Sequence, residues 1–152
     1  MSRPYREAFV EISDDLITLA MCEISKADVQ TKELWDWCNR RLLPVTECIS
    51  GLDLSISSIH VHNGTEGLTP HDHLPHDHTS IVYLLGDTGN LVLHVEGEDC
   101  EVTPCPGLLL TFPASVVHHV KPSTGLRLSL VVNYVLDEQP GFQFDTGNSS
   151  GL

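Results

Sequence analysis

Histidine is the residue type in this sequence with the clearest capacity for chemistry. The chain has nine histidines in 152 residues, and most of them are closely spaced. The clustered ones are His60, His62, His71, His73, His76, His78, His118 and His119. Neutral imidazole is a common ligand of iron, zinc, copper and nickel. Two histidines at i and i+2 of an extended chain point to the same side, so each such pair can hold one ion.

Three pairs with this spacing compete for the first two ligand positions: His60/His62, His71/His73 and His76/His78. A three-ligand site with open positions needs one further ligand from a distant strand, and either His118 or His119 fits that role. Each pair also has a structural interpretation without metal. His60 and His62 can form the polar face of a half-buried strand. The run 71–78 can be a polar surface loop.

The segments that must position these histidines read as short strands separated by Gly, Pro, Ser and Thr turns. The expected strands are 52–62, 80–85, 90–96, 108–112, 116–121 and 126–136. In the last of them, an apolar series from Leu126 to Tyr134 alternates with a series that contains Arg127 and Ser129. This pattern predicts an all-β sandwich or barrel.

The N-terminal part has a different pattern. Segments 6–12 and 16–24 are rich in aliphatic residues and predict an outer hairpin. Leu34, Cys38 and Leu42 recur at i, i+4 and i+8, which predicts a helix over 31–42. The neighbouring Trp35 and Trp37 are expected to pack against the sheet or a partner. We expect one domain over 1–138 and a flexible tail over 139–152.

Composition excludes several classes of protein. The net charge of −13 disfavours binding to nucleic acid or anionic lipid. No apolar run approaches the ~20 residues that cross a bilayer, and the start lacks a secretory signal, so we expect a cytoplasmic protein without membrane contact. Five cysteines without a CxxC pair argue against a disulfide framework or a cysteine zinc site. We expect them to be reduced and mostly buried.

Residues 104–113, 118–122 and 125–129 together resemble the double-stranded β-helix oxygenases that use Fe(II) and 2-oxoglutarate, especially their prolyl-hydroxylase-like branch. In that family a Pro-Gly turn leads a strand that ends in Phe-Pro. A His-x-Val-x-Pro segment then carries the distal iron ligand, and an Arg one strand later binds the co-substrate. The resemblance covers about 59–134. It implies a jelly-roll, cupin-like fold with one N-terminal helix.

Carried over by position, the resemblance makes His118 the distal ligand and Arg127 the anchor of the 2-oxoglutarate carboxylate. An inward Arg needs an anionic partner, which is either this co-substrate or an internal Asp or Glu. The segment 67–73 resembles the proximal ligand motif, so His71 and His73 become the other metal ligands. The resemblance adds Tyr83 and Ser129 as contacts to the co-substrate, although an ordinary buried strand residue is an alternative for Tyr83.

One position departs from the family. The usual motif is His-x-Asp, whereas this chain has His-x-His, which leaves the site more positive by one charge. Asp72 and Asp77 could ligate only from an irregular loop. With this difference noted, the resemblance implies Fe(II), or another divalent metal, as the cofactor and 2-oxoglutarate as the co-substrate.

The expected activity is dioxygenase hydroxylation of a small molecule or a peptide side chain. A cupin-type enzyme with three imidazole ligands and no 2-oxoglutarate is the second hypothesis, although Thr79 and Ser80 occupy the positions where cupins place a glutamate. A jelly-roll binding module without catalysis is the third. Exposed strand edges and the two tryptophans are compatible with a homodimer.

Overall fold

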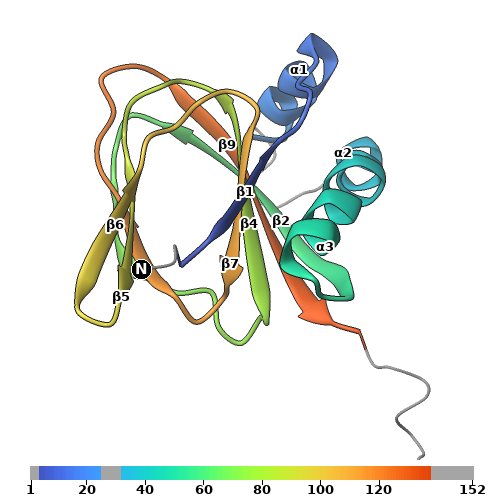
Figure 1. The fold of residues 1–152 in the computed structure, drawn as a ribbon. Helices are drawn as coiled ribbons and strands as arrows, with labels where there is room; N and C mark the ends of the chain where they lie inside the picture. The colour runs from blue at the N-terminus through green and yellow to red at the C-terminus, as the bar shows by residue number, and fades with distance from the viewer. Residues whose placement is uncertain (1–3, 25–31, 138–152) are drawn as a thin grey trace, which may run out of the picture.

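A computed structural model describes residues 4–24 and 32–137, which form two facing β-sheets with helices on one outer side (Figure 1). The first elements in chain order are β1 (Arg6–Phe9), α1 (Asp14–Ile24), α2 (Lys32–Trp37), the π-helical turn η1 (Cys38–Leu42), α3 (Leu43–Ser50) and β2 (Leu54–Gly64). They are followed by β3 (Leu68–His71), β4 (His78–Leu85), β5 (Leu91–Val95), β6 (Glu98–Val102), β7 (Leu108–Pro113), β8 (Val117–Val120) and β9 (Arg127–Leu136).

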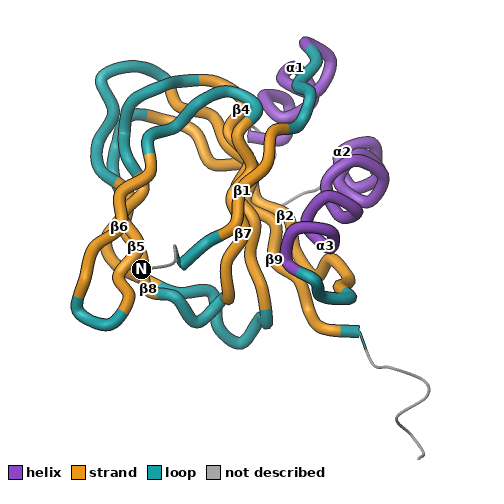
Figure 2. Tube along the Cα trace, viewed as in Figure 1, coloured by secondary structure: helices purple, strands orange, loops and turns teal. Residues whose placement is uncertain are grey.

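The strands pair in the pattern of a jelly roll. One sheet has the order β1-β7-β4-β9-β2 and the other has the order β3-β8-β5-β6, and the pairings are antiparallel. Consecutive strands thus alternate between the two sheets along much of the chain. This is the double-stranded β-helix predicted from the sequence, and its two walls are visible in Figure 2.

The structure has two hydrophobic cores, one on each side of the five-stranded sheet, because side chains along β9 point alternately to its two faces. Leu128, Leu130 and Val132 face outward and pack with Leu34 and Leu42 beneath the helices. Complete burial of a Leu contributes roughly 1.5–3 kcal/mol, so this layer fixes the helices to the five-stranded sheet. A second core lies between the two sheets and includes Tyr83 and Leu93. The inward positions of β9 are therefore free to face an interior site.

The expected strand over 16–24 is wrong, because this segment is the helix α1. Ser13 lies just before it, and its Oγ accepts a hydrogen bond from the backbone N–H of Leu16, as an N-cap does. Leu16 and Ala20 are buried four residues apart, which is helical spacing. Capping and this spacing outweigh the aliphatic content that suggested a strand.

The other N-terminal predictions hold in part. A strand is present in the segment 6–12 as β1, and the helix expected over 31–42 is present as α2 and η1. The helical segment continues through α3 to Ser50 and ends at Gly51, whose φ of 73° is left-handed. Trp35 and Trp37 pack partly buried against the core under the helices. The predicted tail over 139–152 lies outside the described residues.

The strands expected after residue 52 are all present with shifted ends, but two short ones were not predicted. β3 contains Pro70 and has four residues, and β6 is largely acidic. Neither has the apolar alternation that marks a strand. Among the described cysteines, only Cys38 is buried, so the expectation that most are buried is wrong. Among the described helices, none has the length and apolar character needed to span a membrane.

Candidate metal centre

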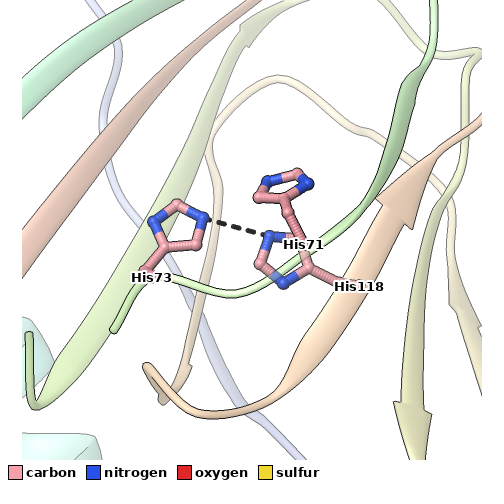
Figure 3. Close-up of side chains that lie close together, drawn as sticks. All are labelled: His71, His73 and His118. Atoms are coloured by element: carbon pink, nitrogen blue, oxygen red, sulfur yellow. Dashed lines mark hydrogen bonds between the residues drawn. The ribbon is translucent and has the colours of Figure 1, made fainter. Parts of the chain in front are cut away.

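Three imidazoles from two sequence regions converge inside the barrel (Figure 3). His71 ends β3, His73 follows in the next loop, and His118 lies on β8. Antiparallel pairing of β3 with β8 places His71 directly opposite His118. One ring nitrogen of each residue lies within 4.8 Å of the others, and the Nε2 atoms of His73 and His118 are 3.1 Å apart. The structure thus brings together the three residues predicted as ligands.

The opposite nitrogen of each ring faces an acceptor. Nδ1 of His71 donates to the carbonyl of Thr69 at 2.7 Å, and Nδ1 of His118 donates to the carbonyl of Val116 at 3.0 Å. A carbonyl only accepts, so the proton of each neutral ring is on Nδ1. The lone pair is then on Nε2. Such partners commonly orient the histidine ligands of a metal.

Asn133 provides the acceptor that orients the ring of His73. Its Oδ1 accepts a hydrogen bond from Nδ1 of His73 at 2.9 Å and another from the Thr79 hydroxyl at 2.8 Å. Its Nδ2 donates to Ser58 Oγ at 3.0 Å, which is consistent with this orientation of the amide. Asn133 was not singled out from the sequence. Its only signal is that it shares the inward face of β9 with Arg127.

Burial favours the neutral form of the rings of His73 and His118. Desolvation lowers the pKa of His118 to about 4, although its bond to the Val116 carbonyl acts in the opposite direction. Desolvation also lowers the pKa of His73. Two neutral rings whose lone pairs face each other at 3.1 Å repel unless a cation lies between them. The donor set therefore fits a divalent metal that takes neutral imidazole nitrogen.

A cavity of about 210 Å³ adjoins the three imidazoles. Apolar side chains such as Ile81, Leu91 and Val131 form part of its wall. Tyr83, Ser129 and Arg127, which were expected to contact a co-substrate, also line it. Burial raises the pKa of Tyr83, so its phenol stays protonated and can donate. Among the described lining residues there is no Asp or Glu.

Arg127 is 1% exposed, and its guanidinium bonds to backbone carbonyls. Its Nη1 donates to the carbonyls of Gly89 at 3.3 Å and Lys121 at 3.1 Å, and its Nη2 donates to the carbonyl of Glu66 at 3.1 Å. Within the described chain it forms no ion pair with Asp or Glu. A guanidinium has five N–H groups, so two are not used in these three bonds.

Gly89 permits this arrangement. A Cβ at Gly89 would lie 1.8 Å from Nη1 of Arg127, so a larger residue would displace the guanidinium. The φ of Gly89 is 86°, which other residues rarely adopt. The three carbonyls come from three different loops, so nothing local in the sequence indicates them.

The remaining histidines do not join the cluster. Nδ1 of His76 lies 2.8 Å from Ser57 Oγ, and His78 is buried beside a different cavity. His119 faces the outer side of the sheet, where its Nδ1 lies 2.7 Å from Nε2 of His94. Asp72 and Asp77 accept backbone N–H groups of Leu74 and Leu136. These two carboxylates stabilise the loop and the end of β9, and neither belongs to the group of close imidazole nitrogens, although Asp72 acts electrostatically on His118.

Comparisons with known proteins agree on the fold. No protein-family model and no curated protein matches the chain. Among solved structures, a Pseudomonas putida prolyl-4-hydroxylase is similar with a TM-score of 0.59 and 17% identity over 91% of this chain and 89% of that one. The non-heme α-ketoglutarate-dependent epimerase SnoN, from nogalamycin biosynthesis, has a TM-score of 0.68 and 14% identity over 96% of this chain and 87% of that one.

A third similar structure is an oxidoreductase of the 2OG-Fe(II) oxygenase family from Burkholderia pseudomallei, with a TM-score of 0.57 and 17% identity. The match covers 65% of this chain and 52% of that protein, so it spans about half of the larger enzyme. At such identities the likeness establishes the shared double-stranded β-helix. The chemistry must be argued from the residues of this chain.

Proposed function

We propose that this protein is an oxygenase that uses Fe(II) and 2-oxoglutarate to hydroxylate a small molecule or a peptide side chain. One observation carries the proposal: three Nε2 lone pairs and a guanidinium with unused N–H groups line the same cavity. This combination suits a metal together with an anionic co-substrate. The solved structures with the same fold include a hydroxylase and an α-ketoglutarate-dependent enzyme, which supports the choice.

Each residue has a role in this proposal. His71, His73 and His118 would hold the metal through Nε2, while Asn133 and two backbone carbonyls fix the rings. Bound Fe(II) would supply the activation of O₂, with 2-oxoglutarate as reductant that leaves as succinate and CO₂. Arg127 would pair with the carboxylate distant from the metal, and the hydroxyls of Tyr83 and Ser129 would donate to the co-substrate.

The apolar part of the wall limits water in the cavity. Ile81 and Leu91 are buried and belong to the core between the sheets. A dry enclosure strengthens the attraction between Arg127 and a carboxylate and reduces side reactions with solvent. Positioning and exclusion of water are the contributions that the protein itself makes to such chemistry.

A three-imidazole metalloenzyme that does not use 2-oxoglutarate is the second candidate. His73 occupies the position of the usual carboxylate, and no Asp or Glu is found among the described residues that line the cavity. A metal held only by neutral ligands keeps its full positive charge, which changes its potential and its preference for further ligands. This observation favours the second candidate and must be tested against the first.

The deciding experiment is an anaerobic titration of the metal-free protein with Fe(II) and then with 2-oxoglutarate. We expect one equivalent of Fe(II) and a metal-to-ligand charge-transfer absorption band on addition of 2-oxoglutarate. Arg127→Gln should abolish the band at matched concentrations, and Arg127→Lys should retain part of it. Arg40→Gln, at an exposed position on η1, is the matched control.

Circular dichroism must show that the Arg127 variants are folded, because their side chain also joins three loops. If the wild-type protein binds the metal but gives no band, the three-imidazole enzyme without 2-oxoglutarate replaces the proposal. If no metal binds in stoichiometric amount, both enzyme hypotheses fail and a binding module remains. The substrate, a homodimer and a cytoplasmic location stay predictions.

A further inference from the structure

Two more imidazoles line the same cavity and have no part in the metal cluster. His60 and His62 lie on β2, and the antiparallel pairing of β2 with β9 places them opposite Val131 and Ser129. Both partners are themselves in the cavity wall. The i and i+2 positions of a strand face one way, so both rings are on the inner side.

These two rings differ from the metal cluster in their hydrogen bonds. His71, His73 and His118 each donate from Nδ1 to a fixed acceptor. In the described part of the chain, no hydrogen bond is found for the ring of His60 or of His62, although the His62 side chain is half-buried. Their ring nitrogens are therefore not committed to a protein partner, and they can bind a ligand in the cavity.

The charge of the cavity indicates what kind of ligand this is. The chain as a whole carries −13, yet the described cavity wall has five histidines and Arg127 without any acidic residue. Burial lowers the pKa of His62, and Arg127 and His71 add smaller effects in the same direction, which shows that these groups act on one another. The rings of His60 and His62 can each donate one N–H even when neutral, and together with the guanidinium of Arg127 they can attract an anion.

His60 and His62 have different neighbours because they occupy different positions along β2. His62 is opposite Ser129, near Arg127, whereas His60 is opposite Val131 and exposed. His60 also acts electrostatically on His73, although burial is the main cause of the lowered pKa of His73. The pair therefore extends from the side of Arg127 toward the metal cluster and the solvent. Both rings line the same cavity as the three imidazoles of the cluster.

We propose that His60 and His62 bind an anionic oxygen group of the primary substrate, a carboxylate or a phosphate, and so select organic acids as substrates. The inference rests on the proposed function in that it takes this cavity as the active site. It adds a second anion site beside the one that Arg127 would provide. Both rings are specificity-determining residues, because they contact the substrate rather than the metal.

The test uses the full chain loaded with Zn(II), which is redox-inert, and saturated with 2-oxoglutarate. Acetate and methyl phosphate are titrated separately while the histidine ring resonances are followed by NMR and the affinity is measured by calorimetry. We expect one of the two anions to shift the ring signals of His60 and His62 in a saturable manner. The double variant His60→Gln/His62→Gln should weaken that affinity by about tenfold or more.

The same double variant should change the affinity for Zn(II) and for 2-oxoglutarate by less than about twofold, because neither ring takes part in those sites. His76→Gln is the matched control, since His76 contacts Ser57 outside the cavity. Unchanged anion affinity in the double variant overturns the inference, because the anion then binds elsewhere, such as at the metal. Weaker binding of 2-oxoglutarate also overturns it, by assigning the pair to the co-substrate.

A failure of the proposed function has a different signature. In that case 2-oxoglutarate would not bind to the metal-loaded wild-type protein at all. The anion titration can still be read in the protein without 2-oxoglutarate. Saturable shifts at His60 and His62 would then support an organic-acid site of another enzyme, and their absence would remove both proposals.

Discussion

Two adjacent histidines on β8 have opposite surroundings. His118 is 2% exposed and faces the cavity, where its Nε2 lies 3.1 Å from that of His73. His119 faces the outer side, where its Nδ1 lies 2.7 Å from Nε2 of His94. In turn, Nδ1 of His94 lies 2.6 Å from Asp99 Oδ1. Both places thus hold histidine rings in close contact, but their hydrogen bonds differ.

On the outer face, the close contact between His94 and His119 is an ordinary hydrogen bond. Asp99 accepts from Nδ1 of His94, and Nε2 of His94 can then accept from Nδ1–H of His119. On the inner face, the Nδ1 protons of both rings are already donated elsewhere, so two lone pairs meet. A short contact between imidazoles is therefore not enough to indicate a metal site. The deciding feature is the hydrogen-bond partner of the other nitrogen in each ring. It determines whether the two facing nitrogens share a proton or present two lone pairs that can bind a metal.

The largest expected effect is the loss of metal binding in His118→Gln. Removal of one of three ligands should weaken the affinity for Zn(II) or Fe(II) by more than ~100-fold. His119→Gln, the adjacent position, should change it by less than ~3-fold. Competition with a chromophoric chelator measures both. Equal losses in the two variants would contradict the difference between the faces.

The second effect is on stability in acid, in the metal-free protein. Because the pKa of His118 is lowered to about 4, the unfolded chain binds this proton more tightly than the folded one. The free energy of unfolding should therefore fall as the pH decreases from about 6.5 to 4, by ~2–3 kcal/mol from this residue.

Urea denaturation at pH 7 and at pH 4.5 tests this contribution. His118→Leu should be less sensitive to acid than the wild-type protein, whereas His119→Leu should retain the full sensitivity. If both variants have the wild-type pH dependence, burial of His118 is not its source.

A third prediction concerns the orientation of His73. Asn133→Ala removes the acceptor of its Nδ1–H and leaves Thr79 and Ser58 without their bonds to the amide. Metal affinity should fall by roughly 10–100-fold, as is usual for residues that orient a ligand. Asn90→Ala is the control, because Asn90 bonds Glu101 on the exterior. Isothermal titration of each variant should give this ranking.

The smallest effect is expected on the outer face. The Asp99 side chain is 64% exposed, and exposed ion pairs contribute little. Asp99→Asn should change the free energy of unfolding by less than ~1 kcal/mol and leave metal affinity unchanged. Thermal denaturation and the chelator assay measure these two quantities. A loss of metal in this variant would show that the outer face also holds an ion.

Much of the fold could be predicted because β9 and its neighbours alternate apolar and polar residues, and alternation specifies which face is buried. Helix α1 was predicted as a strand, since its aliphatic residues suit both structures and its Ser13 cap acts only over one turn. β3 and β6 have no apolar alternation, and only pairing with β8 and β5 makes them strands.

The candidate site also contains residues that could be predicted from the sequence and residues that could not. Its histidines and Arg127 belong to recognisable local motifs. Asn133 and the carbonyls around Arg127 have no motif, because they act through contacts between residues more than 30 positions apart, apart from the Lys121 carbonyl. The alternative partner of Arg127, an internal Asp or Glu, is not found among the described residues, whereas its role toward the co-substrate stays a prediction.

The sequence by itself determined a chain of short alternating strands and three histidine pairs able to grip an ion, because both properties depend on spacing of two residues. Spacing alone could not choose among the pairs, since their local geometry is equivalent, and only the family resemblance favoured His71 and His73. Only the tertiary structure decided that His71 lies opposite His118 while His119 faces outward. The physical reason is that a metal site needs lone pairs from distant strands, and only long-range pairing sets their distance.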